Sequence, residues 1–243
     1  MSMALAASVS AQVSVTGAGQ TFTEGFNSFV GTQASVPTNF TFSDTDYTPG
    51  GFYTFSDAYT SANSNYAFRA SALSTDIAFG QKGPTSGTDF LNWSFVNNSG
   101  QDINSVTISW TALQYSAGGR APTITQNYNL NNTGFVTTGL TGNVFTASTG
   151  ATVSGAQLAS IVSTSFSSTL TFSTAWANGQ SLVLGWGFAT GSGTSSNAHI
   201  AVDNLSLSIA AVPEPSSAAL LVGGVILVGA VMQRRRRAFV KAL

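Results

Sequence analysis

Apolar and polar residues alternate along several short runs of this chain, and this period of two is the feature that most restricts its fold. In the run 91–95, Leu, Trp and Phe alternate with Asn and Ser, and in the run 106–110, Val, Ile and Trp alternate with Thr and Ser. Successive side chains of a β-strand point to opposite faces, so each run places its large apolar residues on one face. An Asn-Asn-Ser-Gly sequence at 97–100 separates the two runs, and the pattern predicts a β-hairpin.

The same pattern recurs through residues 12–211, with Gly, Asn and Asp between the runs. Repeated short strands of this kind predict an all-β fold, an antiparallel β-sandwich of two packed sheets. The apolar run near the C-terminus, described below, adds one transmembrane helix. Within the sandwich we expect one short helix near 154–161 and a turn at 48–51. The further strand candidates are 40–42, 52–55, 66–73, 77–79, 170–176 and 182–188.

The last apolar run of this region changes parity. Ile200 and Val202 share one face of a regular strand, whereas the apolar residues from Leu205 onward would point to the other face. A β-bulge inserts one extra residue and restores a common face. We therefore expect a bulge at Asp203 and the residue that follows it.

Composition excludes several classes of function. The chain has no cysteine, which rules out disulfides, thiol catalysis and thiolate metal sites. Residues 12–211 carry eight acidic and three basic residues, so this region is mildly acidic and lacks the basic patch that nucleic-acid binding requires. Its length is sufficient for one hydrophobic core, and no Pro-rich or charged linker divides it.

An uncharged apolar run at 218–232 is followed by a basic cluster. As a helix, the run is about 22 Å long, and it spans a hydrocarbon core of about 30 Å with help from flanking residues or local thinning. Positive charge stays on the cytoplasmic side, so we expect the residues before Pro213 outside the cytoplasmic membrane. The alternative is a buried core helix with a solvated basic tail. The basic cluster consists of Arg234, Arg235, Arg236 and Arg237.

Pro213, Glu214 and Pro215 stand shortly before the apolar run. The order Pro-Glu-Pro, apolar helix and arginine cluster, here residues 212–243, resembles the PEP-CTERM sorting signal of bacterial envelope proteins. The resemblance implies that a membrane enzyme, an exosortase, recognises the tripeptide, cleaves near it and releases the preceding domain toward the cell surface. Two prolines favour an extended peptide, and an extended peptide fits the cleft of a protease. The alternative is that the prolines only separate the linker from the helix that follows.

The first eleven residues give a weaker sign of export. They are small and apolar, and Val9 and Ala11 fit the rule for signal-peptidase cleavage before Gln12, although no basic residue precedes them. Residues 1–11 are either the remnant of a truncated signal peptide or the start of the first strand. We expect the remnant, because a C-terminal sorting signal works only on an exported chain.

From Phe26 onward the chain resembles a recurrent jelly-roll domain of secreted bacterial proteins, related to lectin-like and carbohydrate-binding sandwiches. In calcium-binding jelly rolls a last-strand Asp meets an acidic residue of the first strand, which implies a calcium site at Asp203 and Glu24. The simpler alternative is that Asp203 caps backbone amides of the bulge. The resemblance rests on the segments 26–29, 51–56, 90–110 and 198–207.

The sequence offers no clear catalytic set. His199 is the only histidine and lies four residues before Asp203, but no Gly-x-Ser-x-Gly sequence accompanies them. A glycosidase needs two carboxyl groups across a cleft, and the spacing of the acidic residues selects no such pair. We therefore expect that the protein is not an enzyme.

The sequence thus predicts an exported, non-catalytic cell-envelope or extracellular-matrix protein, which the sorting-signal resemblance associates with exopolysaccharide and biofilm. The alternative is a carbohydrate-binding module with a specific glycan site, and a secreted hydrolase is a third reading. The expected partners are an exosortase, the cytoplasmic membrane before processing, and polysaccharide. The four tryptophans lie on the apolar faces of their predicted strands and are therefore expected in the core. Sugar contacts would then fall to tyrosines in polar segments, and the candidates are Tyr47, Tyr53, Tyr59 and Tyr115.

Overall fold

The computed structural model of the chain divides it into two compact units, Met1–Ala210 and Ala211–Leu243. The structure describes residues 11–30, 35–43, 47–54, 65–71, 74–82, 87–137, 139–140, 142–150, 156–191 and 197–210, all in the first unit. These residues form strands and connecting loops, which confirms the predicted all-β fold. No helix among them is long and apolar enough to cross a bilayer. The predicted signal remnant, except Ala11, and the predicted membrane helix lie outside the described residues.

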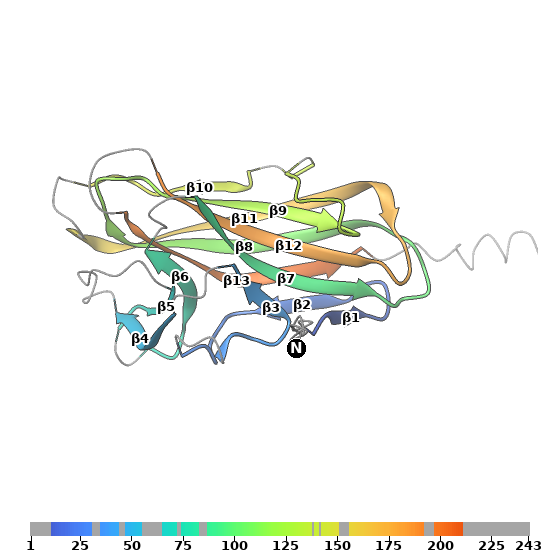
Figure 1. Cartoon of the computed structure of the whole chain (residues 1–243), viewed down its shortest axis with the longest axis horizontal. Coiled ribbons are helices and arrows are strands. Elements are labelled where there is room, and N and C mark those ends of the chain that lie inside the picture. Colours follow the sequence, from blue (N-terminus) through green and yellow to red (C-terminus); the bar gives the residue numbers. More distant parts are fainter. Residues whose placement is uncertain are drawn as a thin grey trace, which may run out of the picture. The chain divides into compact units, whose positions relative to one another are not determined.

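Thirteen strands in the described part of the chain form two sheets (Figure 1). The first sheet contains β1 (Val13–Val15), β3 (Phe40–Phe42), β7 (Thr88–Asn97), β9 (Thr123–Leu130), β10 (Val144–Thr146) and β12 (Ser181–Ala189). The second contains β2 (Thr21–Glu24), β4 (Tyr47–Thr54), β5 (Asn65–Arg69), β6 (Ala78–Lys82), β8 (Ile103–Ala117), β11 (Ala156–Trp176) and β13 (His199–Ile209).

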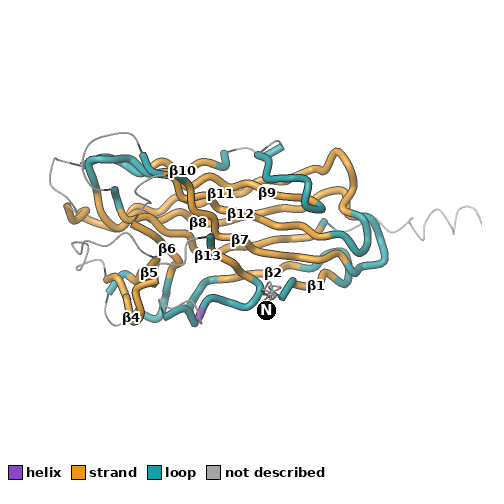
Figure 2. Tube along the Cα trace, viewed as in Figure 1, coloured by secondary structure: helices purple, strands orange, loops and turns teal. Residues whose placement is uncertain are grey.

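The strand order of the first sheet is β1-β7-β12-β9-β10, and β3 also pairs with β7. The strand order of the second sheet is β11-β8-β13-β6-β5-β4, and β2 also pairs with β13. All pairings between these strands are antiparallel except β1 with β7 and β4 with β5. Strands that follow one another along the chain repeatedly change sheet, as expected for a jelly-roll-like sandwich (Figure 2).

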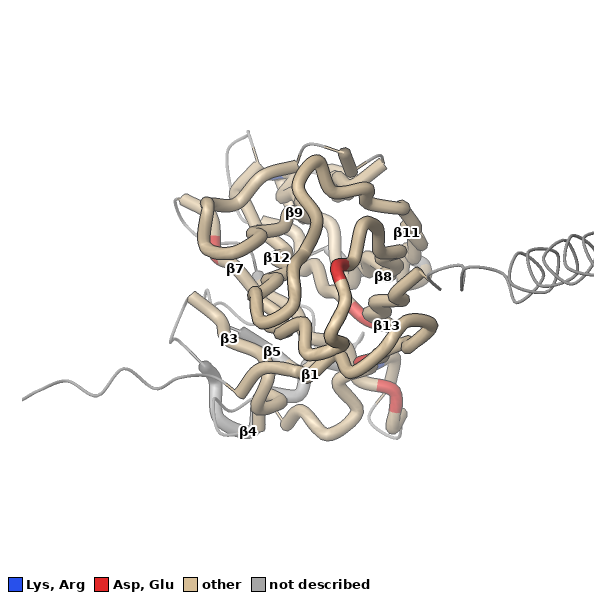
Figure 3. Tube along the Cα trace, turned by 90° about the vertical axis from the view of Figure 1, so that its right-hand side faces the viewer, with Lys and Arg blue, Asp and Glu red and all other residues tan. Residues whose placement is uncertain are grey.

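The core lies between the two sheets and is rich in aromatic residues. Trp93, Trp110, Trp176 and Trp186 are each at most 2% exposed, so the prediction that the tryptophans are core residues is confirmed. Viewed end-on in Figure 3, β7, β12 and β9 lie on one side of this core and β13, β8 and β11 on the other. Without disulfides, burial of this apolar layer is the main source of stability.

The predicted hairpin between the runs 91–95 and 106–110 is wrong. Both runs are strands, but β7 pairs with β12 in the first sheet and β8 pairs with β11 and β13 in the second. The connection around Gly100, which has φ of 74°, therefore crosses from one sheet to the other. The apolar faces of the two runs meet across the core, which buries more surface than pairing side by side would.

Two local predictions also fail. The short helix expected near 154–161 is a strand from Ala156 onward, because Ala156 and Gln157 pair with the end of β8. The turn expected at 48–51 lies within β4, where the register with β5 shifts between Tyr47 and Phe52. Pairing with a neighbouring strand has overridden the local preference in both places.

The predicted bulge in the last strand is confirmed. Asp203 pairs with Thr111 and Ser206 with Ser109, so β13 uses one residue more than β8 over this interval. Asn204 has φ of 50°, a left-handed conformation that asparagine tolerates better than most residues. The bulge keeps the apolar residues on both sides of it in the same core.

Asn97 secures the connection between the sheets. Its Nδ2 atom donates to the carbonyl oxygens of Gln101 (2.8 Å) and Trp176 (2.7 Å), and its Oδ1 atom accepts from the N–H of Ser99 (3.0 Å). Asn97 is fully buried, so its loss leaves buried backbone groups without partners.

We expect Asn97→Ala to lower the free energy of unfolding by about 2 to 3 kcal/mol. Asn98→Ala is the matched control, because exposed Asn98 makes one side-chain bond, to Ser14, and should cost less than about 1 kcal/mol. Urea denaturation followed by tryptophan fluorescence measures both. Equal losses for the two variants would contradict this role of Asn97.

Candidate functional site

The two acidic residues of the predicted calcium site lie on neighbouring strands. Glu24 ends β2 and pairs with Leu205 of β13, two residues beyond Asp203. The Oε1 atom of Glu24 accepts from the N–H of Phe26 (2.6 Å), and the Oδ1 atom of Asp203 accepts from the N–H of Asn204 (2.7 Å). Each carboxylate therefore caps a bend of its own strand, and Asp203 makes the backbone contact that the capping alternative expects.

The environment of Asp203 is unfavourable for a negative charge. Burial raises the pKa of Asp203 to about 6, the N–H of Asn204 acts in the opposite direction, and the charges of Asp76 and Glu24 raise it further. Among the described residues, no three His, Cys, Asp or Glu side chains are arranged to hold a metal ion. Calcium binding at Glu24 and Asp203 thus stays a prediction.

His199 pairs with a buried serine on the neighbouring strand. Ser116 Oγ lies 2.5 Å from the Nδ1 atom of His199 and accepts from the backbone N–H of the same residue (3.1 Å). Ser116 is fully buried and His199 is 1% exposed, so no substrate reaches this hydroxyl. The pair holds β8 to β13 and does not form an accessible nucleophile.

The outward face of the first sheet carries two side-chain amides, one on each side of a glycine strand position. Gly185 of β12 pairs with Asn92 of β7 on one side and with Asn127 of β9 on the other. The Oδ1 atoms of Asn92 and Asn127 are buried and accept no hydrogen bond within the described part of the chain, and Asn127 is only 7% exposed. Two acceptors therefore converge over Gly185 without a donor.

A pair of phenylalanines covers the same surface. Phe135, from the loop after β9, stacks on Phe90 of β7 with ring centroids 5.7 Å apart and ring planes 12° apart. Phe135 is 42% exposed. We call Phe90, Asn92, Asn127, Phe135 and the two glycines of β12, Gly185 and Gly187, the amide face.

The two glycines make this arrangement possible. A Cβ atom on Gly185 would collide with Asn127 Oδ1 and lie 2.9 Å from the ring of Phe135, and a Cβ atom on Gly187 would lie 2.9 Å from the ring of Phe90. A glycine inside a strand often marks the close approach of another group. Here it lets side chains of β7, β9 and the loop lie flat across β12.

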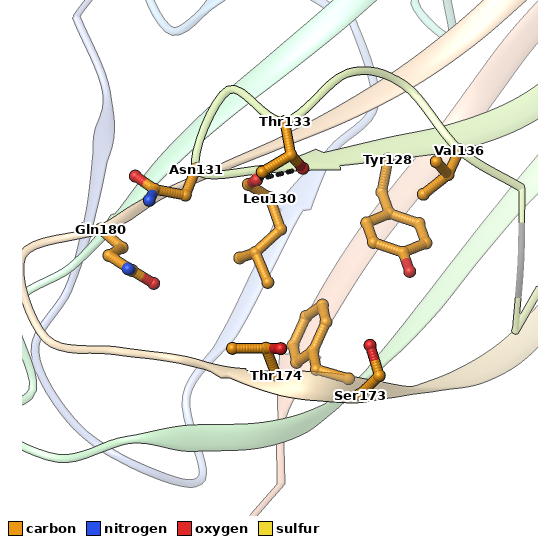
Figure 4. Close-up of a pocket in the computed structure, with 9 residues that line it drawn as sticks. Tyr128, Leu130, Asn131, Thr133, Val136, Ser173, Thr174 and Gln180 are labelled. Carbon is orange, nitrogen blue, oxygen red and sulfur yellow. Dashed lines mark hydrogen bonds between the residues drawn. The ribbon is translucent and has the colours of Figure 1, made fainter.

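The loop that carries Phe135 also borders a pocket of about 280 Å³ between the sheets (Figure 4). Tyr128 and Phe172 supply its aromatic wall, with ring centroids 6.0 Å apart. Thr133 Oγ1 donates to the carbonyl oxygen of Leu130 (2.8 Å) and fixes the loop. The remaining lining residues are mostly polar: Asn131, Val136, Ser173, Thr174 and Gln180.

Of the tyrosines proposed for sugar contacts, Tyr115 is the one whose side chain the structure describes, and it does not belong to this site. Tyr115 is on β8, not in a loop, and is 4% exposed; burial above all, then Asp203 and Asp76, raises the pKa of its hydroxyl. Tyr47 and Tyr53 fall in β4, of whose side chains nothing is described, and Tyr59 lies outside the described residues. The residues of the sorting motif, 213–215, and the arginine cluster, 234–237, also lie outside them.

Sequence reasoning missed the amide face. The one sequence signal for it was the Gly-Trp-Gly sequence at 185–187, which interrupts an otherwise regular strand. The amides and phenylalanines lie on segments between positions 90 and 135, the two glycines follow at 185 and 187, and only the cross-strand register brings them together.

The described domain is a two-sheet β-sandwich whose first sheet carries the uncharged amide face on its outer side. No known protein family and no curated protein matches the sequence. The CBM22-1 xylan-binding domain of Xyn10C from Paenibacillus barcinonensis aligns with 82% of this chain and 99% of its own length, at 13% identity and a TM-score of 0.40. A family 35 carbohydrate-binding module from Clostridium thermocellum aligns over 60% of this chain and 87% of its own, at 12% identity and a TM-score of 0.28. Similarity at this level assigns no ligand to this chain.

We expect Asp203→Asn to stabilise the protein at pH 7.5 by about 1 to 3 kcal/mol, and to have little effect near pH 4. The folded-state pKa of about 6 lies above the unfolded value near 4, so the stability provided by the neutral carboxyl is present below about pH 4 and is lost as pH rises through 6. Thermal unfolding at both pH values measures the difference. A variant that is no more stable than the parent at pH 7.5 would contradict the raised pKa.

The same comparison tests the calcium prediction. Calcium bound by Asp203 and Glu24 would raise the unfolding temperature of the parent protein in millimolar calcium and would not raise that of Asp203→Asn. An equal response of the two proteins would exclude this site.

Proposed function

We propose that this chain is an exported, non-catalytic surface protein that is sorted through its C-terminal signal and binds neutral carbohydrate through the amide face. The apolar run and arginine cluster direct the sandwich away from the cytoplasm by the positive-inside rule. An exosortase then processes the chain near Pro213-Glu-Pro215. The released sandwich remains at the cell surface or in the extracellular matrix.

The observation that carries the sugar-binding part is exposed Phe135, stacked on half-buried Phe90, beside two buried amide oxygens without a donor among the described residues. The C–H faces of sugar rings pack against aromatic rings, and sugar hydroxyls donate hydrogen bonds to amide oxygens. Phe135 supplies an exposed ring, and Asn92 and Asn127 supply buried acceptors. We infer that the loop bearing Phe135 shifts when a glycan binds, so that sugar hydroxyls can reach these acceptors. A polyol thus matches both parts of the face.

The ligand class follows from the charge of the surface. The outward-facing positions of β7, β9 and β12 carry Thr, Ser, Asn, Phe, Val, Ala and Gly, and none of them is charged. Charged sugars are usually held by basic side chains, which this face lacks. We therefore assign it to neutral glycans.

Phe135→Ala should weaken binding to a neutral polysaccharide by about three- to tenfold, because the variant loses the exposed stacking surface. Affinity gel electrophoresis with a panel of soluble neutral polysaccharides measures the change. Val30→Ala is the control, since Val30 is 43% exposed and lies outside the amide face. Unchanged retention of Phe135→Ala on a polysaccharide that binds the parent would assign binding to the Ser, Thr and Asn coat as a whole.

Glu214→Ala tests the sorting part independently. We expect the parent protein recovered from cells to end near residue 215, without the apolar run, and the variant to retain the tail. Intact-protein mass spectrometry of both gives the C-terminal residue. A parent protein whose mass includes Leu243 would contradict processing at this motif.

A further inference from the structure

The outer edge of β11 is long and open in the described part of the chain. β11 is the last strand of the second sheet and pairs there with β8 alone. From Val162 to Thr171 its register with β8 is unbroken. The loop at Gly139 comes close to Leu170 and Thr171, so the open part ends at Thr169 and spans about 26 Å.

This edge lacks the features that usually prevent strands from pairing with other chains. Natural edge strands are short, carry Lys or Pro, or are interrupted by bulges. β1, β3 and β10 have three residues each, and β4 contains Pro49. Between Val162 and Thr169, β11 has no proline, no bulge and no charge, and the chain has no charged residue at all between Arg120 and Asp203.

The side chains of the edge suit a copy of the same strand. Ser163, Ser165, Ser167 and Thr169 form an exposed hydroxyl row on the outward face of the sheet. Within one molecule this row already meets hydroxyls of β8, since Thr169 Oγ1 lies 3.2 Å from Thr107 Oγ1 and Ser165 Oγ lies 3.5 Å from Thr111 Oγ1. Ser and Thr pairs across strands stabilise a sheet by donating to one another.

We propose that β11 pairs antiparallel with β11 of a second copy, with Ser165 opposite Ser165 and Ser163 opposite Ser167. This register pairs residues 162–168 of the two copies and places the hydroxyls of Ser163, Ser165 and Ser167 opposite one another, with Thr169 beyond the paired segment. The core-side residues stay on the opposite face, because opposed residues in a sheet share a face. It joins the second sheets of two molecules into one. The pairing uses the same edge of both copies, so it closes as a two-fold dimer. The amide face lies on the first sheet and remains free.

Charge substitution at Ser165 tests the pairing in the full-length chain, purified in a mild detergent. Ser165 is exposed, so Ser165→Lys and Ser165→Glu should fold normally but place like charges opposite each other. We expect light scattering after size exclusion to show a dimer for the parent, monomers for each variant alone, and a dimer for their equimolar mixture. Thr41→Lys, at an exposed position of β3, should remain dimeric.

A cysteine provides a second measurement, because the chain has none of its own. Directly opposed Cα atoms in an antiparallel pair lie about 4.5 to 5.5 Å apart, within reach of a disulfide. Ser165→Cys should therefore cross-link to a dimer under mild oxidation, and Thr41→Cys should not. A monomeric parent protein, a dimer that persists in both charged variants, or equal cross-linking of the two cysteine variants would overturn the proposal.

Discussion

Burial of the aromatic layer between the two sheets is the interaction on which the rest of this structure depends. The chain has no disulfide and few charges, so closure of the sandwich over residues such as Trp93, Trp110 and Trp186 must supply most of the stability. This closure also decides which parity of each strand points outward. The amide face is formed by outward-pointing residues of β7, β9 and β12, and the hydroxyl row is formed by outward-pointing residues of β11 in the second sheet.

The two surfaces differ in kind, and the sequence of each strand explains the difference. On β12, Gly185 and Gly187 replace outward side chains and let neighbours lie across the strand, which concentrates aromatic rings and amide acceptors at one place. On β11, small hydroxyl side chains leave the backbone edge accessible. Under the proposed function, glycan binds one sheet and a second copy pairs with the other, so the two contacts do not compete.

The sequence predicted those features that depend on residues near one another in the chain. Alternation predicted the strands and their buried faces, and the change of parity after Val202 predicted the bulge, because a strand with one buried face keeps a period of two whichever strand it pairs with. It could not predict that β7 and β8 belong to different sheets, since a hairpin and a crossing between sheets share the same turn residues. The helix expected near 154–161 failed because pairing with β8 decides the conformation of Ala156 and Gln157.

The candidate site was less accessible to sequence reasoning than the fold. Asn92, Asn127 and Gly185 form one row only through the register of three strands, and nothing local marks Asn92 or Asn127 as special. Tyr115 illustrates the opposite error, because its polar neighbours in sequence suggested a loop although the residue is buried on a long strand. Glu24 and Asp203 were placed on neighbouring strands as expected, but both carboxylates also cap their own backbone.

Nuclear magnetic resonance of the asparagine side chains during titration with a neutral oligosaccharide tests the central claim most directly. Binding at the amide face predicts that the side-chain amide signals of Asn92 and Asn127 shift in a saturable way, together with the ring signals of Phe135. The signals of Asn98, which lies at the sheet connection, should stay in place. Saturable shifts at other residues with Asn92 and Asn127 unchanged would contradict the account.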